Sequence, residues 1–189
     1  MEKGGLSQAL VAKGLKAGQV IVWADEMRVG LIGQLRRRWL PRGVKLRQKL
    51  ELKYVWRYLV LAVDPIKGRL WWRWVERLRK ESIFEVLKWF KAEGIEAVIW
   101  DNAPGHTAGL IRACGVPTVN LPPYSPELNP VERIFEELRR QIEGKVYGQI
   151  ELKVEAAELL LKALTADPSR VKRLTGWPWI TDALLSLPA

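Results

Sequence analysis

The stretch AVIWDNAPGH, residues 97–106, decides how this sequence is interpreted. Its four apolar residues end at Asp101, the next four residues contain a proline and a glycine, and His106, which follows them, is the only histidine of the chain. A short, continuously apolar run is typical of a strand that is buried on both faces. The stretch therefore predicts a buried strand that delivers a carboxylate to a turn.

The same pattern occurs once earlier in the chain. Residues 19–24 form another short apolar run, which ends at Asp25 and is followed by Glu26. A helix predicted from Ser82 to about Gly94 separates the two runs, so we expect it to cross over the sheet and leave the two strands parallel. Ligands of α/β sheets bind beyond the carboxyl ends of such strands. Asp25 and Asp101 are therefore expected to lie together.

A helix predicted from Pro130 to about Val146 supplies a third acid. Its apolar face, which includes Ile134 and Leu138, recurs with helical spacing, and Asn129 and Pro130 suit a helix start. Glu132 lies in the first turn at the margin of that face, where it either closes a capping box or points toward the ends of the strands. Glu136, one turn later, is a second candidate on the same side.

Three carboxylates gathered at one edge of a sheet favour a metal site. Unpaired carboxylates repel one another and raise one another's pKa values, and a pair of divalent cations removes that repulsion. The single cysteine, Cys114, and the single histidine exclude sites built on several thiolates or imidazoles. Oxygen ligands select a hard cation, so we expect two Mg²⁺ or Mn²⁺ ions per site, held by Asp25, Asp101 and Glu132, the acidic triad.

Length and composition predict one compact α/β domain. The 189 residues are 48% hydrophobic, and no apolar run approaches the roughly 20 residues that span a membrane. Strands are expected at 28–34, 53–63 and 69–75 with no helix between them, followed by alternating strands and helices and then by helices at 150–164 and 168–174. This order fits a mixed sheet flanked by helices. We expect a soluble, intracellular protein without a membrane partner.

Positive charge is concentrated in one segment. The formal net charge is +10, and the 22 residues from Arg36 to Arg57 contain nine lysines and arginines and a single acid, Glu51. So dense a cluster favours a polyanion over a solvated face or an anionic membrane, because nucleic acid would relieve the repulsion. An interface with a second subunit is the alternative. The candidate DNA contacts in this segment are Arg36, Arg37, Arg38, Arg42, Lys45, Arg47 and Lys49.

The motifs resemble those of a known family. DNAPGHTA (101–108) and NLPPYSPELNPVERIFEELRRQI (120–142) look like the catalytic core of DDE transposases, specifically of the bacterial insertion-sequence transposases related to the mariner superfamily. WADEMRVGLIGQLRRRWLPRG (23–43) resembles that family's first catalytic block. The resemblance implies an RNase H-like (retroviral-integrase-like) fold with a mixed five-stranded sheet. We divide the chain into a lead-in (1–18), the catalytic core (19–150) and a helical extension of the same domain (151–189).

The resemblance also implies an activity and a site. The activity is cut-and-paste transposition, in which metal-dependent hydrolysis of a phosphodiester is followed by strand transfer into target DNA. Carried over residue by residue, the acidic triad is both catalytic and metal-binding. Three further DNA contacts or supporting roles are expected near it, at His106, Tyr124 and Ser125. Glu26 is either a supporting group or a solvated turn residue.

The resemblance predicts partners as well. DNA, both transposon ends and target, is the expected substrate, and a homodimer is the expected active complex. Family members begin with helix-turn-helix modules, whereas this sequence starts almost directly at the first catalytic strand, as a separately encoded catalytic half, a fragment or a remnant would. For a separately encoded half, a helix-turn-helix chain is a further expected partner. A cytoplasmic, nucleoid-associated bacterial location follows. The rival interpretations are an RNase H-like nuclease that only hydrolyses and a repurposed domain that binds DNA without catalysis.

Overall fold

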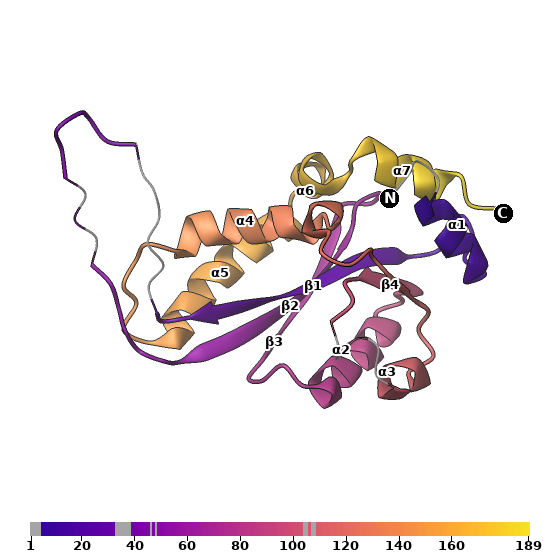
Figure 1. The fold of residues 1–189 in the computed structure, drawn as a ribbon, viewed down its shortest axis with the longest axis horizontal. Coiled ribbons are helices and arrows are strands. Elements are labelled where there is room, and N and C mark those ends of the chain that lie inside the picture. The colour runs from indigo at the N-terminus through magenta and orange to yellow at the C-terminus, as the bar shows by residue number, and fades with distance from the viewer. Residues whose placement is uncertain (1–4, 33–38, 46, 48, 104–105, 107–108) are drawn as a thin grey trace.

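A mixed sheet forms the centre of the molecule (Figure 1). The computed structural model describes residues 5–32, 39–45, 47, 49–103, 106 and 109–189. In these residues the strands are β1 (Ile21–Gly30), β2 (Trp56–Asp64), β3 (Arg69–Val75), β4 (Ala97–Trp100) and β5 (Thr118–Asn120), in the order β3-β2-β1-β4-β5. β1, β2 and β3 are antiparallel neighbours, whereas β4 and β5 run parallel to β1. The expected mixed five-stranded sheet is confirmed.

β1 differs from its sequence-based prediction. The two short strands expected at 19–24 and 28–34 are one continuous strand as far as Gly30, and residues 33–34 lie outside the described part of the chain. β2 pairs with β1 without interruption from Trp23↔Val63 to Gly30↔Trp56. The two acids in the middle do not break the strand, because successive side chains point to opposite faces and each carboxylate finds a partner there.

Helices cover both faces of the sheet (Figure 1). α2 (Lys80–Ala92) and α3 (Gly109–Ala113) pack on one face, in a core that contains Phe90 and Trp100. α4 (Val131–Ile142), α5 (Ile150–Thr165) and α6 (Pro168–Thr175) pack on the other face, in a core that contains Trp23 and Phe135. The alternation of side chains along β1 divides its residues between these two cores. The two faces of the sheet therefore present different side chains of β1 to the helices that cover them.

The two predicted crossover and C-terminal helices form with shifted ends. α2 begins at Lys80 without a side-chain cap rather than at Ser82, and it ends before Gly94, whose φ of +80° suits glycine. The apolar face of α4 is fully buried as expected, but the helix stops at Ile142. Val146 is exposed and lies beyond the helix, because Gly144, also at positive φ, redirects the chain.

The two ends of the described chain lie side by side (Figure 1). α1 (Gly5–Ala12) packs against α7 (Pro178–Leu185), and the amide of Ala17 donates a hydrogen bond to the carbonyl of Pro188 at 2.8 Å. The buried apolar residues of α5, α6 and α7 belong to the core that contains Trp23 of β1 and Phe135 of α4. The C-terminal helices are therefore packed as part of the domain. None of the described helices has the length and apolar content needed to cross a bilayer.

We call the connection between β1 and β2, residues 31–55, the arm; its described residues project away from the body (Figure 1). Its base is closed by the amide of Leu31, which donates to the carbonyl of Val55 at 3.1 Å. Its described residues form neither helix nor strand, and they expose large apolar side chains, among them Trp39, Leu52 and Tyr54. The arm thus combines positive charge with unburied apolar surface.

Candidate active site

Asp25 lies inside β1, not at its end. The parallel pairing of β1 with β4 stops at Trp23↔Ile99, while the antiparallel pairing with β2 continues through Asp25↔Leu61. Beyond Trp23, β1 therefore has no strand on its β4 side. Asp25 shares its face of the sheet with Trp23, so its carboxylate points toward α4. Asp25 therefore lies next to the end of β4, while its own strand continues beyond it.

Asp101 follows the last residue of β4, as the sequence predicted. Its Oδ1 accepts a hydrogen bond from the amide of Ala103 at 2.9 Å, which forms a local turn. Its backbone carbonyl accepts from the side chain of Asn120 at 2.8 Å. The side chain of Asn102 does not orient Asp101; it donates instead to the carbonyl of Leu121. The carboxyl group of Asp101 is 57% exposed.

Glu132 lies in the first turn of α4. Its carboxylate does not close a capping box, since the helix start has no such side-chain bond, and instead Oε2 accepts from Nη1 of Arg139 at 3.1 Å. Glu136, the fallback candidate, pairs with Arg133 at 3.0 Å on the exposed side of α4. Glu132 is therefore the acid of α4 that faces the other two.

Asn129 joins the helix that carries one acid to the strand that carries another, a role that its sequence position as a helix cap did not reveal. The side chain is buried, and its Oδ1 accepts from the amide of Val131 at 3.2 Å. Its Nδ2 donates to Oδ2 of Asp25 at 3.1 Å and to the carbonyl of Ala24 at 3.2 Å. Asn129 thus connects the start of α4 to β1. The only signal in the sequence was its place three residues before Glu132.

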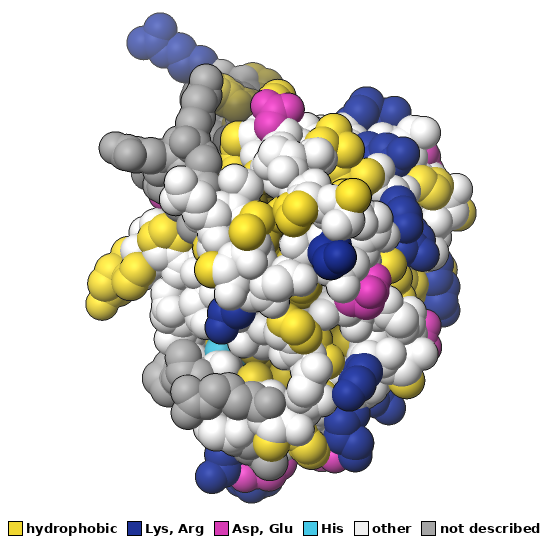
Figure 2. Space-filling model, turned by 90° about the vertical axis from the view of Figure 1, so that its right-hand side faces the viewer, with side chains coloured by type: hydrophobic (Ala, Val, Ile, Leu, Met, Phe, Trp, Pro, Cys, Tyr) yellow, Lys and Arg dark blue, Asp and Glu magenta, His cyan; other side chains and the backbone are white. Residues whose placement is uncertain are grey.

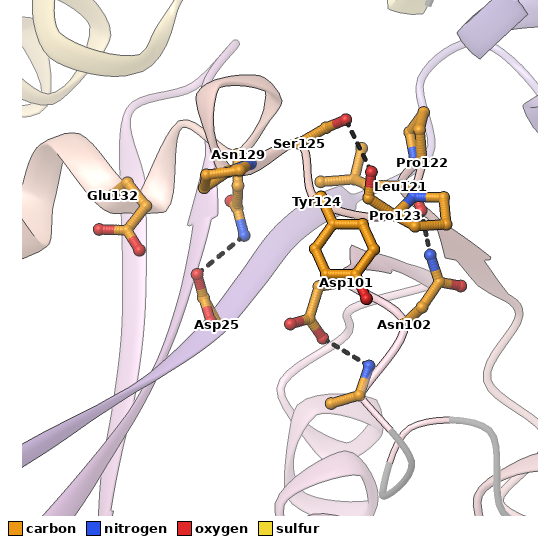
Figure 3. A pocket seen from close by; sticks show the side chains of 12 residues that line it. Asp25, Asp101, Asn102, Leu121, Pro122, Pro123, Tyr124, Ser125, Asn129 and Glu132 are labelled. Atoms are coloured by element: carbon orange, nitrogen blue, oxygen red, sulfur yellow. Dashed lines mark hydrogen bonds between the residues drawn. The ribbon is translucent and has the colours of Figure 1, made fainter.

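The acidic triad lines one pocket of about 480 Å³ (Figure 3). The loop that closes the pocket runs from Leu121 to Pro126, and no lysine, arginine or histidine is among the described residues that line it. Three carboxylates without a cation suit a hard divalent metal ion. The residues of the pocket therefore fit Mg²⁺ or Mn²⁺.

The acidic triad is not arranged as a ready-made metal site with its side chains in these positions. Among the described residues, no three histidine, cysteine, aspartate or glutamate side chains are grouped tightly enough to hold a metal. The expectation that the acidic triad lies within sharing distance is therefore not met with the side chains in these positions. The physical reason is electrostatic, since like charges separate and Glu132 turns to Arg139 for compensation.

Asp25 is the acid of the triad whose pKa responds most clearly to burial and to the neighbouring carboxylates. The pKa of Asp25 is raised from 3.8 to about 7, mostly by burial and in addition by the negative charges of Glu26, Glu132 and Asp101, while the hydrogen bond from the Glu26 amide lowers it. A carboxyl group with such a pKa is held at a cost in free energy at neutral pH. A cation bound beside it would remove that cost.

Glu26 and His106 form a pair on the opposite face of the sheet. Nε2 of His106 lies 3.1 Å from Oε1 of Glu26, and Nδ1 lies 2.8 Å from Oδ1 of Asp101. Burial lowers the pKa of His106, but the hydrogen bond and charge of Glu26, together with Asp101, raise it by more, so the net shift is upward. Of the two roles expected for Glu26, the solvated turn residue is wrong, because the side chain is 7% exposed and paired.

The structure also corrects the expected role of His106. The residue is 3% exposed, and the only histidine of the chain shows as a small patch in the space-filling view (Figure 2). Its ring is stacked on Trp100 with centroids 4.0 Å apart. A direct contact of this ring with DNA is excluded in this arrangement, because one face and both nitrogens are already engaged.

Tyr124 and Ser125 lie at the mouth of the pocket (Figure 3). The side chain of Tyr124 is fully exposed, and the residue adopts a φ of +56°, which is uncommon for a residue other than glycine. Ser125 Oγ donates to the carbonyl of Pro123 at 3.2 Å. Both side chains are therefore accessible to a molecule that reaches the triad.

The basic contacts expected from the sequence lie in the arm. Arg36, Arg37 and Arg38 lie outside the described residues. The other four expected contacts are exposed, and none of them lines the pocket: Arg42, Lys45, Arg47 and Lys49. The arm and the pocket are thus separate features of the molecule.

Comparisons with known proteins agree with this geometry. The chain is 26% identical over 163 residues to the Tc1 transposable-element transposase of Caenorhabditis elegans, a match that covers 76% of this chain and 59% of the relative. The chain therefore spans about three-fifths of that relative's length.

Solved structures share the fold. The Mos1 strand transfer complex is similar with a TM-score of 0.67 at 14% identity, covering 97% of this chain and 60% of that one. The Mos1 mariner paired end complex with Mn has a TM-score of 0.62 at 15% identity, covering 96% of this chain and 61% of that one. These likenesses confirm the expected RNase H-like fold.

The family model described as DDE superfamily endonuclease matches residues 20–153, a span that contains all five strands and the whole acidic triad. This span is well over half of the chain, and the chain belongs to the DDE superfamily of endonucleases.

Proposed function

We propose that this chain is the catalytic domain of a DDE transposase, which hydrolyses phosphodiesters at the ends of a DNA element and joins the freed 3′ ends to target DNA. One observation carries the proposal. Three carboxylates from β1, from the residue after β4 and from α4 line a single pocket, and no basic side chain is among the described residues that line it. Family membership and the Tc1 relative support the same activity.

The acidic triad would hold the metal ions, Mg²⁺ or Mn²⁺, two per site. Such ions activate an attacking water or hydroxyl and stabilise the leaving oxygen of a phosphodiester. The residues of this chain contribute the arrangement around them. Asn129 keeps the carboxylate of Asp25 turned toward the start of α4, and the Leu121–Pro126 loop shapes the entrance through which DNA approaches.

DNA is the proposed partner of the arm and of the pocket mouth. Two of the similar Mos1 structures are named as a strand transfer complex and a paired end complex. The exposed cations of the arm would contact phosphates, which positions DNA without reading its sequence. The exposed apolar side chains of the arm favour a second role, as a contact between two copies in a homodimer. A separate helix-turn-helix chain and a bacterial, nucleoid-associated origin stay predictions.

A DNA-joining assay tests the activity. The protein is incubated with supercoiled plasmid and a fluorescent duplex that carries free 3′ hydroxyls, in Mn²⁺, in Mg²⁺ or in EDTA. We expect metal-dependent nicking and covalent joining of the label, both abolished in Asp101→Asn and both retained in Glu136→Gln, the matched control on α4. Nicking without joining would favour the purely hydrolytic nuclease, and binding without nicking would favour the repurposed domain.

A salt titration tests the arm. Replacing four of its described cations, Arg42, Lys45, Arg47 and Lys49, by glutamine should reduce the slope of log affinity against log salt by about 0.9 for each phosphate of duplex DNA that the arm no longer neutralises. Any preference between sequences should stay nearly unchanged. The control removes the same number of exposed cations from the body, at Lys13, Lys16, Lys67 and Arg173. An unchanged slope with an altered sedimentation coefficient would assign the arm to subunit contact instead.

A further inference from the structure

Glu26 does not belong to the pocket that its neighbour Asp25 lines. Side chains alternate along β1, so Asp25 faces α4 while Glu26 faces the side of the sheet that α2 and α3 cover. The Glu26 side chain is 7% exposed, and a carboxylate so deeply buried requires a partner. That partner is His106, which arrives from the segment after β4.

Three contacts determine the position of the His106 ring. Trp100, the last residue of β4, stacks on the ring at 4.0 Å with an angle of 8° between the planes. Nε2 then meets Glu26 at 3.1 Å, and Nδ1 meets Oδ1 of Asp101 at 2.8 Å. The stacking on Trp100 and the contacts made by both ring nitrogens together hold the imidazole in one orientation.

Asp101, in contrast, has little else to hold it. It lies beyond the last paired residue of β4, and more than half of its side-chain surface is accessible. The amide of Ala103 and Nδ1 of His106 both engage the same oxygen, Oδ1. Held at one oxygen, the carboxylate keeps its Oδ2 available.

We propose that Glu26 and His106 are a positioning pair, which braces Asp101 through the sheet so that its second oxygen is presented to a divalent cation. The proposal rests on the proposed function, because it requires Asp101 to be a metal ligand. Partners that orient metal ligands in this way typically change metal affinity by about 10-fold to 100-fold when they are mutated. Neither residue touches the metal or the DNA.

The decisive variant removes the pair without leaving a buried charge. In Glu26→Leu/His106→Phe the aromatic ring can still stack on Trp100, and replacing both partners of a buried pair by apolar residues preserves stability far better than removing one. We expect the double variant to melt close to wild type in EDTA. Its Mn²⁺ affinity, measured by calorimetry on the folded protein, should fall by about 10-fold to 100-fold.

Two further variants make every outcome informative. Glu26→Gln retains an acceptor for Nε2, so its Mn²⁺ affinity should remain within about three-fold of wild type, well short of the loss expected when the pair is removed. The glutamine side chain of His106→Gln can contact the carboxylate of Glu26 or that of Asp101, but not both. This variant should therefore weaken Mn²⁺ binding by about 10-fold, and it tests the proposal even if the double variant fails to fold. Wild-type Mn²⁺ affinity in the folded double variant, or in folded His106→Gln, would overturn the positioning role.

Asp101→Asn separates this failure from failure of the proposed function. If Asp101→Asn binds Mn²⁺ as wild type does, Asp101 is not a ligand, and both the proposed metal site and the proposed positioning pair are refuted. If Asp101→Asn loses Mn²⁺ affinity while the double variant retains it, the metal site stands and the positioning pair alone is refuted. A loss in both supports the proposal.

Discussion

Asp25→Asn should stabilise the metal-free protein, and by an amount that grows with pH. The pKa of Asp25 lies at about 7 in the folded protein against 3.8 in the unfolded chain. The folded state binds the proton of Asp25 more tightly than the unfolded state does. The contribution of Asp25 to the free energy of unfolding of the wild type is therefore most favourable below about pH 4, falls as the pH rises and levels off above about pH 7. The variant carries no charge at this position and does not share that loss.

The magnitude follows from the shift. Each pKa unit corresponds to about 1.4 kcal/mol, so the full shift is worth about 4 kcal/mol above pH 7 and about 2 kcal/mol at pH 5. Oδ1 accepts from the Glu26 amide and Oδ2 from Asn129. The asparagine loses one of these two bonds, but so does a protonated aspartate, and this cost of about 1 kcal/mol does not vary with pH.

Urea unfolding in EDTA at pH 5, 6, 7 and 8, at constant ionic strength, measures the difference. The gain of Asp25→Asn over wild type should increase by about 2 kcal/mol from pH 5 to pH 7 and then stay level. Glu136→Gln should show no such trend. Mg²⁺ should reverse the order by stabilising wild type alone. If the difference in free energy of unfolding between variant and wild type were constant, or shrank as the pH rises, the raised pKa of Asp25 would be refuted.

Three other changes test neighbouring contacts. Arg139→Gln should tighten Mn²⁺ binding by several-fold in calorimetry, because Glu132 no longer has a competing cation at 3.1 Å; weaker binding would contradict this. Asn129→Ala should cost about 2–4 kcal/mol in urea unfolding, since a cap and a donor to a buried carbonyl are both removed. Lys153→Met should cost about 3–5 kcal/mol, because Glu143 is left buried without its cation, and a near-neutral effect would show that the pair is dispensable.

Much of the candidate site was predictable because its signals are local. Four short patterns depend only on interactions within a few residues. They are the apolar runs that end at Asp25 and at Asp101, the proline-rich loop, and the helix start at Glu132. The buried face of α4 followed from helical spacing and is confirmed. Such patterns specify which residues belong to an element and which side chains it can offer.

What the sequence by itself determined, therefore, is most of the helices and strands, though not α1, α7 or the continuity of β1, together with the three acids that line the pocket. Only the tertiary structure decided how those acids are held. That Asp25 lies inside a strand depends on the pairing of β1 with the distant strand β2, and its unpaired side depends on where β4 stops. Asn129 reaches Asp25 across 104 residues, and His106 reaches Glu26 across 80. No local pattern encodes such partners, because burial creates the need for a hydrogen bond and the packing of distant elements determines which group meets it.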